Sequence, residues 1–270
     1  MVRALLSILF IFSITLNANA AGGLPFSSSF ETGDFSEWDG GDQNTLTVTN
    51  QDASDGNYSA RALHQAGSPN DNWKEHYFGN HPGISGEPAD DELWLSFDSK
   101  FDTNFRFGND QNLQKIAIIN FENTSWRRRY QLIINLSIAD ETYFIENLSW
   151  NEDRSFDKLV NYYLQNVGSS TVSMRRGQWD NIKLYSKLNT PGQRNGILRL
   201  WVNDVLTIEV TDAYQRENTD FTPNKLILSN YTGTWTDITG SQWWDNFYIG
   251  ETAPDTATQA PPSPPRLLEQ

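Results

Sequence analysis

Two short stretches joined by a turn decide the fold: WDNIKLY (residues 179–185) and GILRLWVND (residues 196–204). In the first, Ile182 and Leu184 alternate with Asn181, Lys183 and Tyr185; in the second, apolar residues at 198, 200 and 202 alternate likewise. A period of two places apolar side chains on one face of a β-strand and polar ones on the other. Turn-forming residues at 189–192 and 195–196 lie between the two stretches. The sequence therefore predicts an antiparallel hairpin with one apolar face.

The same alternation recurs along the chain, over residues 93–101, 126–138 and 226–231. No stretch predicts a long amphipathic helix, and residues 157–165 are expected to form a short helix or a loop. The absence of an internal repeat argues against a propeller or a solenoid. Many alternating strands in one long segment predict an all-β fold, a β-sandwich of two antiparallel sheets.

The composition excludes several classes of protein. The chain has 270 residues, 13% of them aromatic, a net charge of -14 at pH 7 and no Cys. That many aromatic residues are incompatible with a disordered chain, and the lack of Cys excludes disulfides and a Cys nucleophile. The acidic balance argues against nucleic acid and membrane as partners, because both are anionic. No Glu-x-Asp-x-Glu, Gly-x-Ser-x-Gly or His-Glu-x-x-His motif is present.

The chain divides into three parts. Residues 1–20 hold a basic start, an apolar run and a small-residue pattern ending at Ala20, which together predict a cleaved signal peptide. Residues 21–250 contain no linker and are expected to form one domain. Residues 251–270 are rich in proline, which predicts an extended tail. We expect a secreted or periplasmic monomer.

Polar faces of the predicted strands carry aromatic residues beside charged ones. Lys183 lies with Tyr185 on one such face, and Arg199 with Trp201 on another. An aromatic ring supplies an apolar platform, and its polar neighbours supply hydrogen bonds. We therefore expect these residues to line a binding groove. The alternative, that the rings only cover loops, stays open.

The hairpin of residues 179–204 resembles the G-x-W-h … G-x-h-x-h-W-h-N-G pattern (h, apolar) of concanavalin A-like jelly rolls. The stretches FETGDFSEW (residues 30–38) and WDNFYI (residues 244–249) resemble the first and last strands of such domains. Within this fold the chain is most similar to the jelly-roll polysaccharide lyases, including alginate and glucuronan lyases. The resemblance covers most of residues 30–250 and implies a jelly-roll domain that acts on polysaccharide.

The resemblance extends in part to the catalytic strands. Alginate lyases of this type carry a Tyr-Phe-Lys-Ala-Gly-x-Tyr strand, and the matching segment here is KLILSNY (residues 225–231). Tyr231 matches the final Tyr, whereas Ile227 replaces the Lys and Ser229 replaces the Gly. Their Gln-x-His strand has its nearest counterpart at residues 116–120, with Asn120 in place of the His. Their Arg-x-Glu-Leu strand has only a partial match here, at Arg61.

Elimination from a uronate needs a group that neutralises the carboxylate, a base for the neighbouring carbon-bound proton and an acid for the leaving oxygen. The resemblance implies Tyr231 as acid or base, which requires a nearby Arg to lower its pKa. His76, in a segment rich in charge, is a further candidate. The alternative is that Tyr231 is a half-buried strand residue and the arginines are solvated. The expected catalytic residues are Tyr231, Asn120, Arg129 and His76, and the expected substrate-binding residues are Arg61, Arg127, Lys183, Tyr185, Arg199 and Trp201.

A structural Ca²⁺ is implied by the same resemblance, because jelly-roll carbohydrate modules often hold one where the first and last strands meet. Glu31 and Asp245 lie at the matching places and are the expected ligands, since Ca²⁺ prefers oxygen donors. The alternative is that Asp245 only caps a turn.

Three functions fit these observations. The leading hypothesis is a secreted lyase that cleaves a uronate-containing polysaccharide by β-elimination. The alternative is a non-catalytic, lectin-like carbohydrate-binding domain that uses the same groove. In the third, the fold is only a spacer in a surface protein, and its polar faces would then carry no aromatic cluster.

Overall fold

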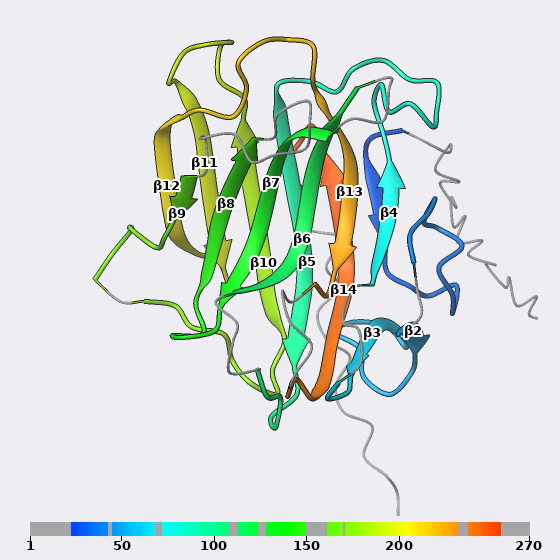
Figure 1. Cartoon of the computed structure of the whole chain (residues 1–270). Helices are drawn as coiled ribbons and strands as arrows, with labels where there is room; N and C mark the ends of the chain where they lie inside the picture. Colours follow the sequence, from blue (N-terminus) through cyan, green and yellow to red (C-terminus); the bar gives the residue numbers. More distant parts are fainter. Residues whose placement is uncertain are drawn as a thin grey trace, which may run out of the picture.

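The computed structural model describes residues 23–42, 45–67, 72–107, 113–123, 128–149, 161–169, 171–231 and 237–254. These residues form fourteen β-strands and no helix (Figure 1). In this part of the chain, accordingly, no helix is long and apolar enough to cross a membrane. The predicted signal peptide and all but the first four residues of the predicted tail lie outside the described residues.

One sheet has eight strands in the order β12-β11-β10-β5-β14-β3-β2, with β1 paired to β14 as well. Every pairing in it is antiparallel. Its strands are β1 (Phe26–Ser28), β2 (Leu46–Thr49), β3 (Ser59–His64), β5 (Glu92–Phe101), β10 (Asp180–Lys187), β11 (Gly196–Val202), β12 (Val205–Ala213) and β14 (Gly240–Gly250).

The second sheet has six strands in the order β4-β13-β6-β7-β8-β9, again antiparallel throughout. It lies across the eight-stranded sheet, in front of it in Figure 1. Its strands are β4 (Trp73–Tyr77), β6 (Leu113–Glu122), β7 (Arg128–Ser137), β8 (Tyr143–Ser149), β9 (Asn161–Tyr163) and β13 (Pro223–Ser229).

The predicted sandwich of two antiparallel sheets is confirmed. The predicted hairpin corresponds to β10 and β11, which pair antiparallel from Ile182 opposite Val202 to Lys187 opposite Ile197. The segment 157–165, expected to be a short helix or a loop, contains strand β9, and its residues 157–160 lie outside the described part of the chain.

The main hydrophobic core lies between the two sheets. Strand β11 alternates buried and half-buried residues, as the period of two predicts. Phe97 and Phe247 are almost fully buried in this core, and their rings stack with centroids 5.0 Å apart. Each fully buried side chain of this kind contributes about 1.5–3 kcal/mol to folding.

The six-stranded sheet also buries its outward face. Every residue of β8 and of β13 is buried. A second apolar cluster, formed by Ile118, Ile133, Leu148 and Ile227 with Trp73 packed against it, lies on this outward face. Polar side chains surround this cluster, so the outward face carries buried apolar and buried polar groups side by side.

Candidate active site

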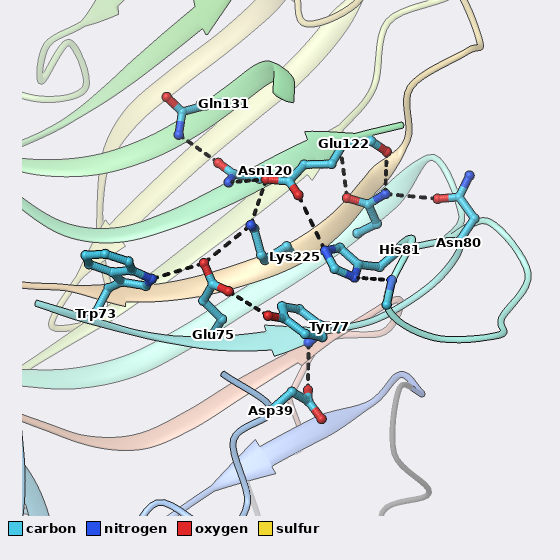
Figure 2. Close-up of polar contacts among 12 residues, drawn as sticks. Asp39, Trp73, Glu75, Tyr77, Asn80, His81, Asn120, Glu122, Gln131 and Lys225 are labelled. Carbon is cyan, nitrogen blue, oxygen red and sulfur yellow. Dashed lines mark hydrogen bonds and ion pairs between the residues drawn. The ribbon is translucent and has the colours of Figure 1, made fainter. Parts of the chain in front are cut away.

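The polar residues of the outward face are brought together by the strand register. Tyr77 on β4 lies opposite Lys225 on β13, Lys225 lies opposite Asn120 on β6, and Asn120 lies opposite Gln131 on β7. Side chains alternate along a strand, so Glu75 shares the outward face with Tyr77. Four strands therefore contribute to one row of polar side chains (Figure 2).

Lys225 is at the centre of this row. Its Nζ lies 2.7 Å from Glu122 Oε1 and 3.3 Å from Glu75 Oε1. The residue is only 8% exposed, so both ion pairs are shielded from water. Two carboxylates share one ammonium group, which leaves this trio with one negative charge in excess.

Tyr77 and Glu75 form a hydrogen-bonded dyad at the accessible side of the row. The Tyr77 hydroxyl donates to Glu75 Oε2 at 2.7 Å, and Trp73 Nε1 donates to Glu75 Oε1 at 3.1 Å. Burial, and then the neighbouring Glu75 carboxylate, raises the pKa of Tyr77. Tyr77 therefore keeps its proton at neutral pH, and both residues are only half-buried.

His81 lies between Tyr77 and Glu122. Its ring stacks on that of Tyr77 with centroids 4.0 Å apart, and its Nε2 lies 3.4 Å from Glu122 Oε2. Its Nδ1 accepts a hydrogen bond from the Gly83 amide at 3.0 Å, so in the neutral ring the proton is on Nε2. The loop of residues 80–87 lines a hollow beside this histidine.

Amide side chains hold Glu122 in place. Asn120 Nδ2 donates to Glu122 Oε1 at 3.0 Å, and Gln131 Nε2 donates to Asn120 Oδ1 at 2.7 Å. The Asn224 side chain accepts a hydrogen bond from the backbone N–H of Glu122 and donates one to the backbone C=O of the same residue. Burial by itself raises the pKa of Glu122, but hydrogen bonds from His81, Lys225 and Asn120 outweigh it and lower that pKa. Glu122 is thus an ionised, fixed carboxylate.

Of the expected catalytic residues, the structure places Asn120 in this network and Tyr231 away from it. Tyr231 follows the end of β13, six positions after Lys225, which corresponds to about 20 Å of extended chain. Its amide donates to Ser229 Oγ, and Lys115 Nζ lies 4.8 Å from its ring centroid. The structure therefore does not bring Tyr231 and Asn120 together.

His76 points to the other side of β4. Its ring stacks on Phe26 with centroids 3.7 Å apart, and its Nδ1 lies 2.9 Å from Asp39 Oδ2. Burial lowers the pKa of His76, although Asp39 opposes this effect. His76 is thus a core residue, separated from the network by the backbone of its own strand.

Of Arg61, Arg127 and Arg129, the structure describes the side chain of Arg61 alone, and Arg61 lies away from the network. Arg61 lies on β3 of the eight-stranded sheet, where it donates to Ser241 Oγ and Gln51 Oε1. The backbone of Arg129 belongs to β7, but its side chain is not among the described groups, and Arg127 lies outside the described residues.

The other expected substrate-binding residues lie on the opposite sheet. Lys183 and Tyr185 belong to β10, and Arg199 and Trp201 belong to β11. These side chains are half-buried on the outward face of the eight-stranded sheet. The sandwich core separates them from Lys225, so they cannot share a groove with it.

Glu31 and Asp245 hold one loop. Glu31 Oε1 accepts the amides of Asn57 and Tyr58, and Asp245 Oδ2 accepts those of Ser54 and Asp55. Among the described residues no group of three or more His, Cys, Asp or Glu is arranged to hold a metal ion. In this structure the carboxylate oxygens of both residues accept backbone hydrogen bonds. Calcium binding stays a prediction from the sequence.

Most residues of the network were not among the site residues expected from the sequence. Glu75 and Tyr77 belong to the stretch WKEHY (residues 73–77), whose alternation is short and whose inward residues are Lys74 and His76. Lys225 lies on the predicted catalytic strand, two residues before Ile227, the position to which the resemblance assigns the family's Lys. A search for polar residues on the same face of β13 would have found it.

Comparison with known proteins identifies the family of this chain. The protein-family model described as polysaccharide lyase matches residues 30–246. This match covers most of the chain, and the chain therefore belongs to the polysaccharide lyase family. The predicted resemblance to these lyases is thereby confirmed.

Solved structures of three lyases resemble this chain. The endo-β-1,4-glucuronan lyase from the fungus Trichoderma reesei is 15% identical, with a TM-score of 0.59 over 84% of this chain and 95% of the other. The PL-14 alginate lyase from Aplysia kurodai is 14% identical, with a TM-score of 0.55 over 77% and 88%. The alginate lyase Aly36B is 14% identical, with a TM-score of 0.54 over 87% and 93%. At these identities the likeness shows the fold. A search of curated proteins found no match.

Proposed function

We propose that this member of the polysaccharide lyase family is exported and cleaves a uronate-containing polysaccharide by β-elimination on the outward face of the six-stranded sheet. The observation that carries the proposal is the buried Lys225 between two carboxylates, with the Tyr77–Glu75 dyad beside it. A cation for the substrate carboxylate and a proton-carrying hydroxyl are the groups that elimination requires.

The substrate carboxylate would bind Lys225 in place of Glu75. The Glu75 ion pair is the longer of the two, at 3.3 Å, whereas Glu122 is held by additional hydrogen bonds. Lys225 then stabilises the negative charge that develops on the carboxylate when the neighbouring carbon loses its proton. Glu75, released from its cation, becomes a better proton acceptor for Tyr77.

The Tyr77–Glu75 dyad would move the protons. The C5 proton passes to the Tyr77 oxygen while the Tyr77 proton passes to Glu75, 2.7 Å away. The C4–O bond then breaks, the C4=C5 double bond forms, and Tyr77 protonates the leaving oxygen. Glu75 finally returns to Tyr77 the proton that it received from the Tyr77 hydroxyl. No proton is gained or lost, and both residues end as they began.

One dyad that handles both protons restricts the substrate. The C5 hydrogen and the C4 oxygen must lie on the same side of the sugar ring, as they do in β-1,4-linked glucuronate and mannuronate. In galacturonate they lie on opposite sides. We therefore expect glucuronan and mannuronate-rich alginate to be cleaved and pectate to remain intact.

The test is the ultraviolet absorbance of the unsaturated product, recorded with alginate, glucuronan, pectate, hyaluronan and heparin. Tyr77→Phe should lower kcat by about 10²–10⁴-fold. Tyr231→Phe is the matched control, because it removes the hydroxyl that the family resemblance favours.

Loss of turnover in Tyr231→Phe with retention in Tyr77→Phe would move the active site to the end of β13. Absence of product from every polymer would favour the non-catalytic binding domain. Export is tested separately by determining the N-terminus of the mature protein, which should begin at Ala21.

A further inference from the structure

The outward face of the eight-stranded sheet carries three aromatic rings from three adjacent strands. Trp94 on β5 lies opposite Tyr185 on β10, and Trp201 on β11 lies opposite Lys183 on β10. The ring centroids of Trp94 and Tyr185 are 4.8 Å apart, and those of Trp94 and Trp201 are 5.8 Å apart at an interplanar angle of 21°. We call Trp94, Tyr185 and Trp201 the aromatic band.

The band is partly open to solvent, unlike the neighbouring part of the same face. There, the loop between β2 and β3 covers the sheet. The Ser54 hydroxyl donates a hydrogen bond to Asp98, and the Ser54 amide donates one to Asp245, and both aspartates are buried. All three rings of the band are instead half-buried, although they pack against one another. Large aromatic side chains left open together on one surface are typical of a binding site rather than of a plain solvent face.

The charges around the band cancel. Lys183 Nζ lies 2.5 Å from Asp204, Lys187 Nζ lies 2.6 Å from Glu92, and Arg199 Nε lies 2.8 Å from Glu209. The surface is therefore locally neutral in a chain whose net charge is -14. A polyanion gains no net attraction here, whereas the hydroxyl groups of a neutral sugar find both donors and acceptors.

From the rings and the cancelled charges together, we propose that the aromatic band binds a second polysaccharide chain through the apolar faces of gluco-configured pyranose rings. Such rings carry their hydroxyls at the edge and expose C–H groups on the face, which matches an aromatic platform. The core lies between this surface and Lys225, so the inference stands whether or not the Lys225 network is catalytic.

The test is calorimetric titration of the full chain with cellohexaose. This neutral oligosaccharide has no carboxylate for elimination, so binding is measured without turnover. Trp94→Ala and Trp201→Ala should each weaken binding about ten-fold. Trp179→Ala is the matched control and should bind as the wild type does. This Trp directly precedes β10 and contacts Lys100 and Asp52 outside the band.

Two further titrations test the inference even if an Ala variant fails to fold. Trp201→Phe retains a ring and should lose less affinity than Trp201→Ala. A glucuronate hexamer, titrated in the Lys225→Met background, asks whether the uronate binds the same band. Tighter binding of cellohexaose than of the glucuronate hexamer supports the neutral ligand.

Three results would overturn the inference. The first is no binding of cellohexaose by the wild-type chain. The second is binding that survives both Trp94→Ala and Trp201→Ala in folded protein. The third is loss of binding in Lys225→Met protein that is folded.

Discussion

At the scale of single residues, Lys225 is a buried charge whose stability depends on its ion-pair partners. A buried ammonium group is tolerated because Glu122 and Glu75 lie within ion-pair distance of it. Conversely, those two carboxylates depend on Lys225, since the hydrogen bonds from Asn120 and Trp73 carry no charge. The residue that we propose neutralises the substrate carboxylate is therefore also a structural residue.

Lys225→Met should abolish turnover and lower the free energy of unfolding by about 3–5 kcal/mol, because it leaves the buried Glu122 and the half-buried Glu75 without this cation. The melting temperature should fall by roughly 10 °C. Adding Glu122→Gln to this variant removes one of the two charges and should restore part of the stability without restoring activity. A double variant as unstable as Lys225→Met would show that Glu122 is not held by this ion pair.

At the scale of elements, strand β14 and the loop between β2 and β3 are joined by one carboxyl group. Asp245 accepts the amides of Ser54, Asp55 and Asn246. Burial nevertheless raises the pKa of Asp245 to about 7, and Asp98 adds to the increase. In the unfolded chain this carboxyl has its ordinary pKa of about 4. The folded protein therefore holds this proton more tightly than the unfolded chain does.

The stability from Asp245 should be fully present below about pH 4 and decline as the pH rises to about 7, on the order of 4 kcal/mol in all. In Asp245→Asn the melting temperature should change less with pH across this interval. The exposed Asp220, changed to Asn, serves as the control and should leave the pH profile unchanged. An Asp245→Asn profile as steep as that of the wild type would contradict the assignment.

At the scale of the whole molecule, the two sheets have different outward faces. In the six-stranded sheet, strands β8 and β13 are buried on both faces, and the outward face carries an ionised network. The outward face of the eight-stranded sheet shows half-buried aromatic residues whose charged neighbours are paired. The core of the sandwich separates the two faces. A substrate chain and a second glycan chain could therefore bind at the same time.

Because the two faces share no side-chain contact among the described residues, losses from the two should add. In the double variant Lys225→Met/Trp94→Ala, the loss of turnover should equal that of Lys225→Met, and the loss of cellohexaose affinity should equal that of Trp94→Ala. Coupling larger than about 0.5 kcal/mol would show that the faces communicate through the core.

The amino-acid sequence by itself determined the class of fold, because alternation with a period of two is a local property, and enough of the strands show it. The hairpin of residues 179–204 illustrates this, since its alternation and turn residues were sufficient to predict β10 and β11. The sequence also indicated Asn120 as a site residue, through the resemblance of its strand to those of known lyases.

Only the tertiary structure decided which residues share a surface. Alternation tells on which face of its strand a residue lies but not to which sheet the strand belongs, so Trp201 and Asn120 were expected in one groove and lie on opposite sheets. Glu75, Glu122 and Lys225 are far apart in the sequence, and only the strand order β4-β13-β6 makes them neighbours. The charge network exists because three distant strands pair, and no local pattern records that pairing.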